Sequence, residues 1–212
     1  ASIEKIQRLG LEVMGGFILG FDSDPPDIFR RQLEFIQRNG IVQSMVGLLG
    51  ALPNTDLYKR LEREGRLIEL REQSTGDNVD AQLNFIPKMP ASTLVDGYKH
   101  VIMETYAPKK YFSRALTLIS RLPDLKVRDL RHADPWRKAL ARAKLAHPPK
   151  TIKILWSVLG LLFSSYGYYV FPFLIKSLRY GVLSLHVAFD LAFRGRHYYT
   201  VSRKINKVEV PP

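Results

Sequence analysis

Cysteine is absent from all 212 residues of the sequence. The chain therefore has no disulfide bond and no metal site with thiolate ligands, although this absence says little about its compartment. The five histidines do not lie in a metal-ligand spacing either. We predict no metal site in this chain, and no residue stands out as catalytic. The histidines are His100, His132, His147, His186 and His197.

Several common functional motifs are also missing. The glycines within residues 15–20 do not follow the Gly-x-Gly-x-x-Gly order of a dinucleotide fingerprint, and they lack the Gly-Lys-Ser/Thr end of a phosphate loop. There is no Gly-x-Ser-x-Gly nucleophile elbow. No zinc-finger, RNP or basic-zipper pattern indicates a nucleic-acid-binding domain. No signal peptide is visible at the N-terminus, so we expect a cytoplasmic protein.

Acidic residues are scarce in the second half of the chain. Residues 109–212 contain 20 Lys and Arg against 5 Asp and Glu, a net charge of +15, whereas residues 1–108 contain 12 against 15, a net charge of −3. The excess of positive charge therefore comes from the second half. It favours anionic partners and leaves nucleic acid and anionic lipid open as alternatives.

Residues 12–22 have the pattern of a buried strand broken by glycines. The near-continuous apolar run indicates a parallel strand covered on both faces. Glycine weakens a strand interior, so Gly16 and Gly20 indicate either a bulge or the close approach of a ligand or another backbone. Asp22 and Asp24 follow the run. They could bond a ligand at the strand end, but we favour helix capping for both.

Helices and strands alternate through the first third of the chain. The signals are a helix at 2–9, a strand at 12–22, a helix at 28–38 that ends at Asn39-Gly40, a strand at 42–52 and a helix at 56–64 capped by Thr55 or Asn54. This order predicts an α/β fold with a parallel sheet and helical crossovers. Ligands gather at the carboxyl ends of such strands, where residues 20–24 and 51–55 fall.

The middle of the chain is predicted to be helical. After a polar loop at 67–80, helices are expected at 90–106 and 109–121, interrupted by Pro108, and at 135–146, before a linker at 147–150. The helix at 109–121 has an apolar face opposite its arginines. That face comprises Tyr111, Phe112, Ala115, Leu118 and Ile119.

The C-terminal region contains 22 consecutive uncharged residues, 154–175. This length could span a bilayer. The run also contains serines, tyrosines, glycines and Pro172, which predict a break near Tyr166-Gly167. Three interpretations stay open: a spanning helix, helices packed on the rest of the protein, and apolar helices lying on a membrane surface with Trp156 at the interface.

Two sets of motifs carry a resemblance to a known family. Gly-Phe-Ile-Leu-Gly at 16–20 and Leu-Gly-Ala-Leu-Pro-Asn-Thr-Asp-Leu-Tyr at 49–58 resemble the fifth and sixth strands of a radical S-adenosylmethionine (SAM) barrel. Asn-Phe-Ile-Pro at 84–87, Gly97-Tyr98, Tyr-Ala-Pro at 106–108 and Tyr-Phe-Ser-Arg at 111–114 resemble the C-terminal extension of cobalamin-binding radical SAM proteins of the hopanoid C2-methylase type. The resemblance covers about residues 1–200.

The resemblance implies a division into three regions. Residues 1–70 would be the C-terminal strands and helices of a partial TIM-like barrel, residues 71–149 a mostly helical extension, and residues 150–212 an apolar, basic helical region. The family's [4Fe-4S] cluster needs a Cys-x3-Cys-x2-Cys loop, which this chain lacks. We therefore expect the C-terminal part of a longer enzyme, inactive on its own.

The resemblance also implies a chemistry and a set of site residues. The parent enzyme would be a cobalamin-dependent C-methyltransferase that cleaves SAM and acts on a lipid-like or other unactivated carbon. Gly16, Ile18 and Gly20 would contact the adenine and ribose of SAM, and Leu49 and Ala51 would line the adenine pocket; the alternative for each is a bulge or tight packing. Three tyrosines also match the family motifs, and they could either lie near the substrate or belong to the core: Tyr98, Tyr106 and Tyr111.

Two other classes of function stay open beside the enzyme. The first is a non-catalytic membrane-associating or scaffolding domain, which the basic, apolar C-terminus favours. The second, less favoured, is a basic nucleic-acid binder, including a transfer-RNA-modifying relative. If the substrate is a lipid, contact between residues 150–212 and the inner face of the membrane would serve the enzyme as well.

Overall fold

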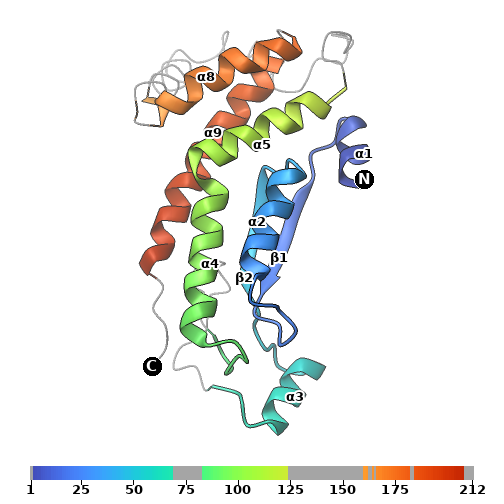
Figure 1. Cartoon of the computed structure of the whole chain (residues 1–212), viewed down its shortest axis with the longest axis vertical. Helices are drawn as coiled ribbons and strands as arrows, with labels where there is room; N and C mark the ends of the chain where they lie inside the picture. The colour runs from blue at the N-terminus through green and yellow to red at the C-terminus, as the bar shows by residue number, and fades with distance from the viewer. Residues whose placement is uncertain are drawn as a thin grey trace, which may run out of the picture.

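The computed structural model describes residues 2–68, 83–123, 160–161, 164, 166–181 and 184–207. An α/β segment is followed by a mostly helical one (Figure 1). Most of the predicted polar loop, the predicted helix at 135–146 and the predicted linker lie outside the described residues. The elements are α1 (Ser2–Arg8), β1 (Met14–Leu19), α2 (Ile28–Arg38), β2 (Gln43–Leu48), α3 (Asp56–Arg63), α4 (Ala91–Tyr106), α5 (Pro108–Arg121), α8 (Gly167–Ser177), η2 (Leu178–Tyr180), α9 (Ser184–Ser202) and η3 (Arg203–Lys207).

Strands β1 and β2 pair in parallel, and α2 crosses from one to the other. The register runs without interruption from Met14 opposite Gln43 to Leu19 opposite Leu48. The predicted parallel pairing and α/β class are confirmed, although the strands are shorter than the sequence pattern indicates. Within the described residues the sheet has two strands, so each strand keeps one unpaired edge.

Local signals set the ends of the helices. Asn39 is the C-cap of α2 and is followed by Gly40 at φ 63°, and Gly65 at φ 64° follows α3. The hydroxyl of Thr55 accepts a hydrogen bond from the Tyr58 backbone N–H at 3.2 Å. Of the two predicted caps, Thr55 and Asn54, it is therefore Thr55 that caps α3. Pro108 begins α5, where its missing N–H costs nothing.

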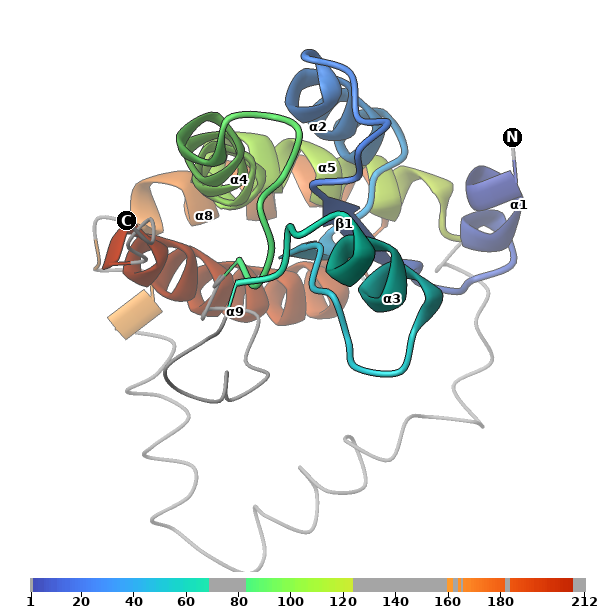
Figure 2. The ribbon, with the colours of Figure 1, turned by 90° about the horizontal axis from the view of Figure 1, so that it is seen from below.

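The two faces of the sheet differ in burial. Leu19 and Val46 are buried on one face, and Phe17 beside them meets the ring of Phe35 in α2 at 6.1 Å. Figure 2 shows α2 and α4 together on one side of the strands. Alternate residues point to the other face, where Met14 and Ile18 are exposed. The prediction that β1 is covered on both faces is therefore wrong for the described part of the chain.

Four helices form the second layer of the molecule. Helix α9 packs against α4, α5 and α8, and α8 also packs against α5 (Figure 1). The Phe112 ring lies 4.6 Å from that of Phe173 and 5.4 Å from that of Tyr166. The hydroxyl of Tyr111 donates to the Leu191 carbonyl at 2.9 Å. The predicted apolar face of α5 is thus confirmed as a core face.

Arg114 departs from that prediction, because it lies in the core and not on a polar face. Its side chain is buried. Its guanidinium donates to the carbonyls of Ile41 at 2.9 Å and Thr105 at 2.5 Å, and to Oε1 of Gln37 at 3.2 Å. Burial lowers the pKa of Arg114 to about 10. One cation therefore joins α2, α4, α5 and the segment that leads into β2.

The C-terminal helices are packed on α5. Helix α8 begins at Gly167, which confirms the predicted break near that residue. No helix in the described residues is both long enough and apolar enough to cross a membrane. The described part of the 154–175 run, which includes most of α8, follows the packed-helix interpretation through Val170 and Phe173, both buried.

Candidate functional site at the strand ends

The carboxyl ends of β1 and β2 lie side by side. The backbone N–H of Leu49 donates to the Leu19 carbonyl at 2.8 Å, one step beyond the regular ladder. Gly20 follows with φ 108°, a conformation that side chains other than glycine rarely adopt. Both strands therefore leave the sheet at the same edge, where sequence analysis places the ligand.

Asp24 holds the turn that follows β1. Its Oδ2 accepts hydrogen bonds from the backbone N–H groups of Gly20 at 2.8 Å and Phe21 at 3.0 Å. The prediction that Asp24 caps a helix is wrong, because the N-cap of α2 is Asp27. The carboxylate instead stabilises the chain reversal at the strand end. The positive φ of Gly20 and this local bond belong to the same turn.

Asp22 is the centre of an ion-pair cluster. Arg66 donates to both carboxylate oxygens, at 2.7 and 2.9 Å, and Arg60 of α3 donates to one of them at 3.2 Å. The hydrogen bond from Arg66 lowers the pKa of Asp22, against the opposing effect of burial. Asp22 therefore neither caps a helix nor offers a free carboxylate to a ligand. It ties the end of β1 to α3 and to the chain after it.

Asn84 holds the end of β2. Its Oδ1 accepts from the backbone N–H of Ala51 at 2.9 Å, and its Nδ2 donates to the Ala51 carbonyl at 2.7 Å. The Ala51 side chain is buried with Leu61 and Phe85. Sequence analysis assigns Ala51 to the pocket lining but misses the residue that positions it. The signal was present, since Asn84 opens the Asn-Phe-Ile-Pro motif.

The structure separates Gly16 from Gly20. A Cβ at Gly20 would lie 3.1 Å from the Leu94 side chain of α4, so Gly20 is explained by its turn and by packing. A Cβ at Gly16 would meet nothing within 4 Å among the described residues. The register is continuous through Gly16, which pairs with Met45. Neither a bulge nor internal packing accounts for that glycine.

Gly16 and Ile18 lie on the open face of the sheet. The register places Met45 and Gly47 beside them on β2, and Ile18 and Met45 are each 52% exposed. This face is apolar and shallow, because two of its positions lack side chains. It can accept a flat apolar group or a further layer of the protein. Leu49, at the end of β2, is partly buried against the Ala51 cluster.

The three tyrosines are core residues. Tyr98, Tyr106 and Tyr111 are at most 8% exposed. The Tyr106 hydroxyl donates to the carbonyl of Ser44 in β2 at 2.6 Å. Burial raises the pKa of Tyr98 to about 12 and also raises that of Tyr111. Tyr106 thus ties α4 to β2, and Tyr111 ties α5 to α9. The described residues include no cluster of three potential metal ligands.

A family model described as a domain of unknown function, DUF4070, matches residues 55–209. The chain belongs to this family. DUF4070 is the C-terminal region of cobalamin-binding radical SAM proteins, as the resemblance of the sequence motifs predicts. The match covers α3, the helical layer and the segments between them.

Two curated proteins are similar to the chain. An uncharacterized methyltransferase, sll1242, of Synechocystis sp. is 36% identical over 113 residues, which are 53% of this chain and 21% of that protein. The hopanoid C-2 methylase of Rhodopseudomonas palustris is 33% identical over 112 residues, 53% of this chain and 20% of that protein. The aligned part of the chain spans about a fifth of the length of these relatives. No solved structure gives a significant match.

Proposed function

We propose that this chain supplies part of the SAM site of a radical SAM C-methyltransferase that uses cobalamin. The observation that carries the proposal is Gly16 on the open face of a parallel sheet, with free space where a side chain would stand. Both named relatives are methyl-transferring proteins by name, which supports the reaction class. A lipid-like or other unactivated carbon is the proposed substrate class.

The proposed fold is the C-terminal part of a TIM-like barrel in residues 1–70, followed by a helical extension at 71–149 and a basic apolar region at 150–212. In a barrel, one face of each strand is covered by helices and the other faces the interior. The covered and open faces of β1 and β2 match that arrangement. The unpaired strand edges are where further strands would join.

Each proposed site residue has a distinct task. Gly16 leaves room for the adenine and ribose of SAM, and Ile18 packs against the adenine. The backbone beyond Gly20, held by Asp24, and the stretch from Leu49 to Ala51, held by Asn84, would form the rim. The chain lacks cysteine, so the [4Fe-4S] cluster takes its ligands elsewhere, and no residue here is assigned to cobalamin. When bound, these groups would supply the radical and the methyl group.

The test is Gly16→Val in the full-length parent enzyme. The new side chain enters open space, so the melting temperature is expected to stay within a degree or two, while SAM affinity falls at least tenfold. Ser120→Val, at an exposed position of α5, is the matched control. Unchanged SAM affinity in a calorimetric titration of Gly16→Val would remove the proposal.

Peripheral membrane contact is the second proposed property, located in residues 150–212 and at the inner face of the membrane. It is favoured by large apolar side chains that α8 leaves exposed, including Tyr168 and Phe171. Exposed apolar side chains on a helix that also carries basic Lys176 suit a lipid surface. This property is independent of the SAM site, and it also accommodates the non-catalytic membrane-associating alternative.

A further inference from the structure

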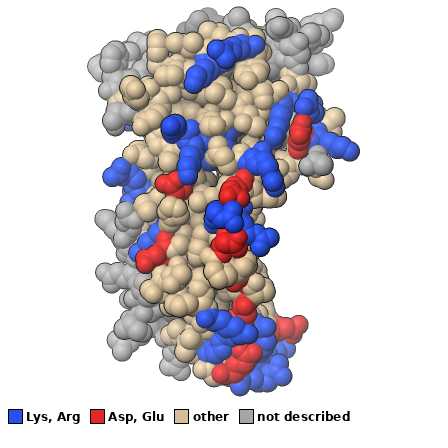
Figure 3. Space-filling view, in the orientation of Figure 1, with Lys and Arg blue, Asp and Glu red and all other residues tan. Residues whose placement is uncertain are grey.

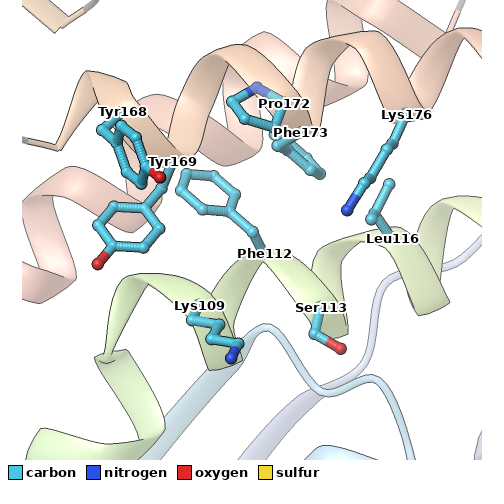
Figure 4. Close-up of a pocket in the computed structure, with 9 residues that line it drawn as sticks. All are labelled: Lys109, Phe112, Ser113, Leu116, Tyr168, Tyr169, Pro172, Phe173 and Lys176. Atoms are coloured by element: carbon cyan, nitrogen blue, oxygen red, sulfur yellow. The ribbon is translucent and has the colours of Figure 1, made fainter.

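A pocket of about 370 Å³ lies between α5 and α8 (Figure 4). Figure 1 places these helices at the end of the molecule opposite α3, which follows the carboxyl end of β2. The pocket is therefore separate from the candidate SAM site. Its lining residues are Lys109, Phe112, Ser113, Leu116, Tyr168, Tyr169, Pro172, Phe173 and Lys176.

The lining is apolar inside and basic at its margins. Phe112 and Phe173 form the floor from opposite helices, and both belong to the buried core. Lys109 and Lys176 contribute the charged groups, and both side chains are exposed. None of the nine lining residues is acidic. An apolar interior with ammonium groups at its edge suits an amphiphile with an anionic head.

Pro172 shapes the α8 wall of the pocket. It lies inside the helix and has no N–H, so the carbonyl of Tyr168 loses the hydrogen bond that position 172 would supply. Pro172 therefore leaves this carbonyl without its usual helical donor, in a wall that is lined by aromatic rings. A ligand with a hydroxyl as well as an anionic group, such as a phosphoglycerol head, can use both features.

The outer side of α8 and the first residue of η2 carry an apolar stripe next to the pocket. Tyr168, Phe171, Ile175 and Leu178 recur at helical spacing and are 79%, 63%, 54% and 46% exposed. We call these four residues the α8 stripe. An exposed apolar stripe on a helix that also carries basic residues is the pattern of a helix that lies in a membrane interface.

The stretch of sequence that contains α8 carries charge of one sign. Residues 135–189 contain eight Lys and Arg and no Asp or Glu. In Figure 3, the part of the surface that α8 occupies shows basic side chains on a largely uncharged background. Anionic bilayers attract such a surface, and the attraction weakens as salt screens it.

The size of the pocket limits how much of a lipid it holds. A volume of about 370 Å³ is near the lower end of the range of about 300–1,000 Å³ for small-molecule sites. It accommodates a head group or a short part of an acyl chain. The remainder of the lipid must stay outside, which is natural when the lipid remains in a bilayer touched by the α8 stripe.

We propose that the pocket between α5 and α8 binds one anionic phospholipid of a bilayer on which the α8 stripe rests. Lys109 and Lys176 pair with the head group, and Phe112, Leu116 and Phe173 contact its apolar part. The inference rests on the proposed membrane contact and adds a specific lipid site to it. It is independent of SAM binding, so either proposal can fail alone.

Vesicle flotation and calorimetry test this site. The chain is mixed with vesicles of phosphatidylcholine alone or with 30% phosphatidylglycerol, and titrated with soluble dihexanoyl phosphatidylglycerol. One basic residue near an anionic surface contributes a factor of about five in binding. Lys109→Gln with Lys176→Gln should therefore weaken vesicle binding by about 30-fold. Lys5→Gln with Lys59→Gln removes the same charge from exposed residues of α1 and α3 and serves as the control.

Two further variants separate the pocket from the stripe. Ser113→Phe fills the pocket from an exposed position of α5 and should abolish saturable binding of dihexanoyl phosphatidylglycerol. Phe171→Ser with Ile175→Ser should leave that binding intact while vesicle binding at high salt is lost. Circular dichroism melting checks that each variant folds.

Each result of these experiments either supports or overturns the proposed lipid site. One saturable site, lost in Ser113→Phe and weakened by the pocket lysine pair alone, supports the proposal. Equal loss in both lysine pairs would show a non-specific electrostatic effect and overturn it. Binding of decanoate without phosphatidylglycerol would point to a free fatty acid site, and no binding to any lipid would leave a protein surface; each also overturns it.

Discussion

Arg194 and Glu12 form a two-pronged ion pair across 182 residues of sequence. Nη1 and Nη2 of Arg194 donate to Oε1 and Oε2 of Glu12, each at 2.9 Å, and both side chains are under 30% exposed. The pair joins α9 to the segment that enters β1. The C-terminal helix is thereby attached directly to the start of the strand that carries Gly16.

Glu12→Gln should lower the free energy of unfolding by about 1 kcal/mol, because it removes the charge from a partly screened pair with good geometry. Urea denaturation measures the change. Glu34→Gln, which alters an exposed pair with Arg30, is the control and should have little effect. Equal effects of the two substitutions would show that the long-range pair stabilises the fold no more than an exposed pair does.

Arg114→Met should destabilise the chain by about 3 kcal/mol, because it leaves the carbonyls of Ile41 and Thr105 buried without their donor. Arg114→Lys retains a cation but loses the planar fork, so its effect should be only slightly smaller. Denaturant melts of both variants test this. A near-neutral result for Arg114→Met would mean that the apolar side chain compensates for the lost hydrogen bonds.

Asn84→Ala should cost about 2 kcal/mol, because both hydrogen bonds to the Ala51 backbone are lost. In the full-length parent, the end of β2 should then loosen and SAM affinity should fall. Asn39→Ala removes an exposed bond to the Phe35 carbonyl and is the matched control. A stable Asn84→Ala variant with normal SAM affinity would contradict a positioning role.

The pairing of Asp22 with Arg66 predicts a dependence of stability on acid pH. The folded-state pKa of Asp22 is lowered from its ordinary value of 3.8, so the unfolded chain takes up this proton first. The stabilisation is present above about pH 4 and is lost as the pH falls through the lowered pKa. Asp22→Asn should remove this part of the acid dependence, as seen in urea titrations between pH 2 and 6. An unchanged acid slope would assign it to other carboxylates.

Gly97→Ala should destabilise the packing of α2 on α4 by about 1–3 kcal/mol, because a Cβ at this position would lie 2.3 Å from the Phe29 ring. Adding Phe29→Leu to Gly97→Ala should recover part of the loss, since the smaller side chain vacates the space. Thermal melts of the single and double variants measure this coupling. Additive losses would show that the effect of Gly97→Ala does not come from its contact with the Phe29 ring.

The sequence predicted the helix ends, which depend on nearby residues, but it did not predict the hydrogen bonds between distant residues. Gly40, Thr55 and Pro108 act within a few residues of themselves, so the helix ends they mark were predicted. Arg114 donates to the Ile41 carbonyl 73 residues away, and Asn84 bonds to the Ala51 backbone 33 residues away. Both residues lie in motifs of the family resemblance, but nothing local in the sequence identifies these partners. The predicted site residues Gly16 and Ile18 share a face because side chains alternate along a strand. The sequence does not show that Gly20 has a positive φ and a close neighbour in Leu94, whereas Gly16 has neither.

The apolar run of β1 led to a wrong prediction for a related reason. A run of apolar residues indicates that both faces of a strand are buried, but it does not identify the segments that bury them. Leu19 finds its cover in this chain, in the core it shares with Leu94 of α4, whereas Ile18 on the opposite face is exposed.

Among the described residues, the outer edges of β1 and β2 pair with no further strand, and this affects how the chain behaves in solution. A strand edge with free backbone groups accepts another strand, and Lys or Pro that would discourage this is missing from both six-residue strands. At high concentration, copies are expected to join edge to edge, starting from the sheet and not from α8. An oligomer measured for this chain would then report strand capture rather than an assembly with a role in its function.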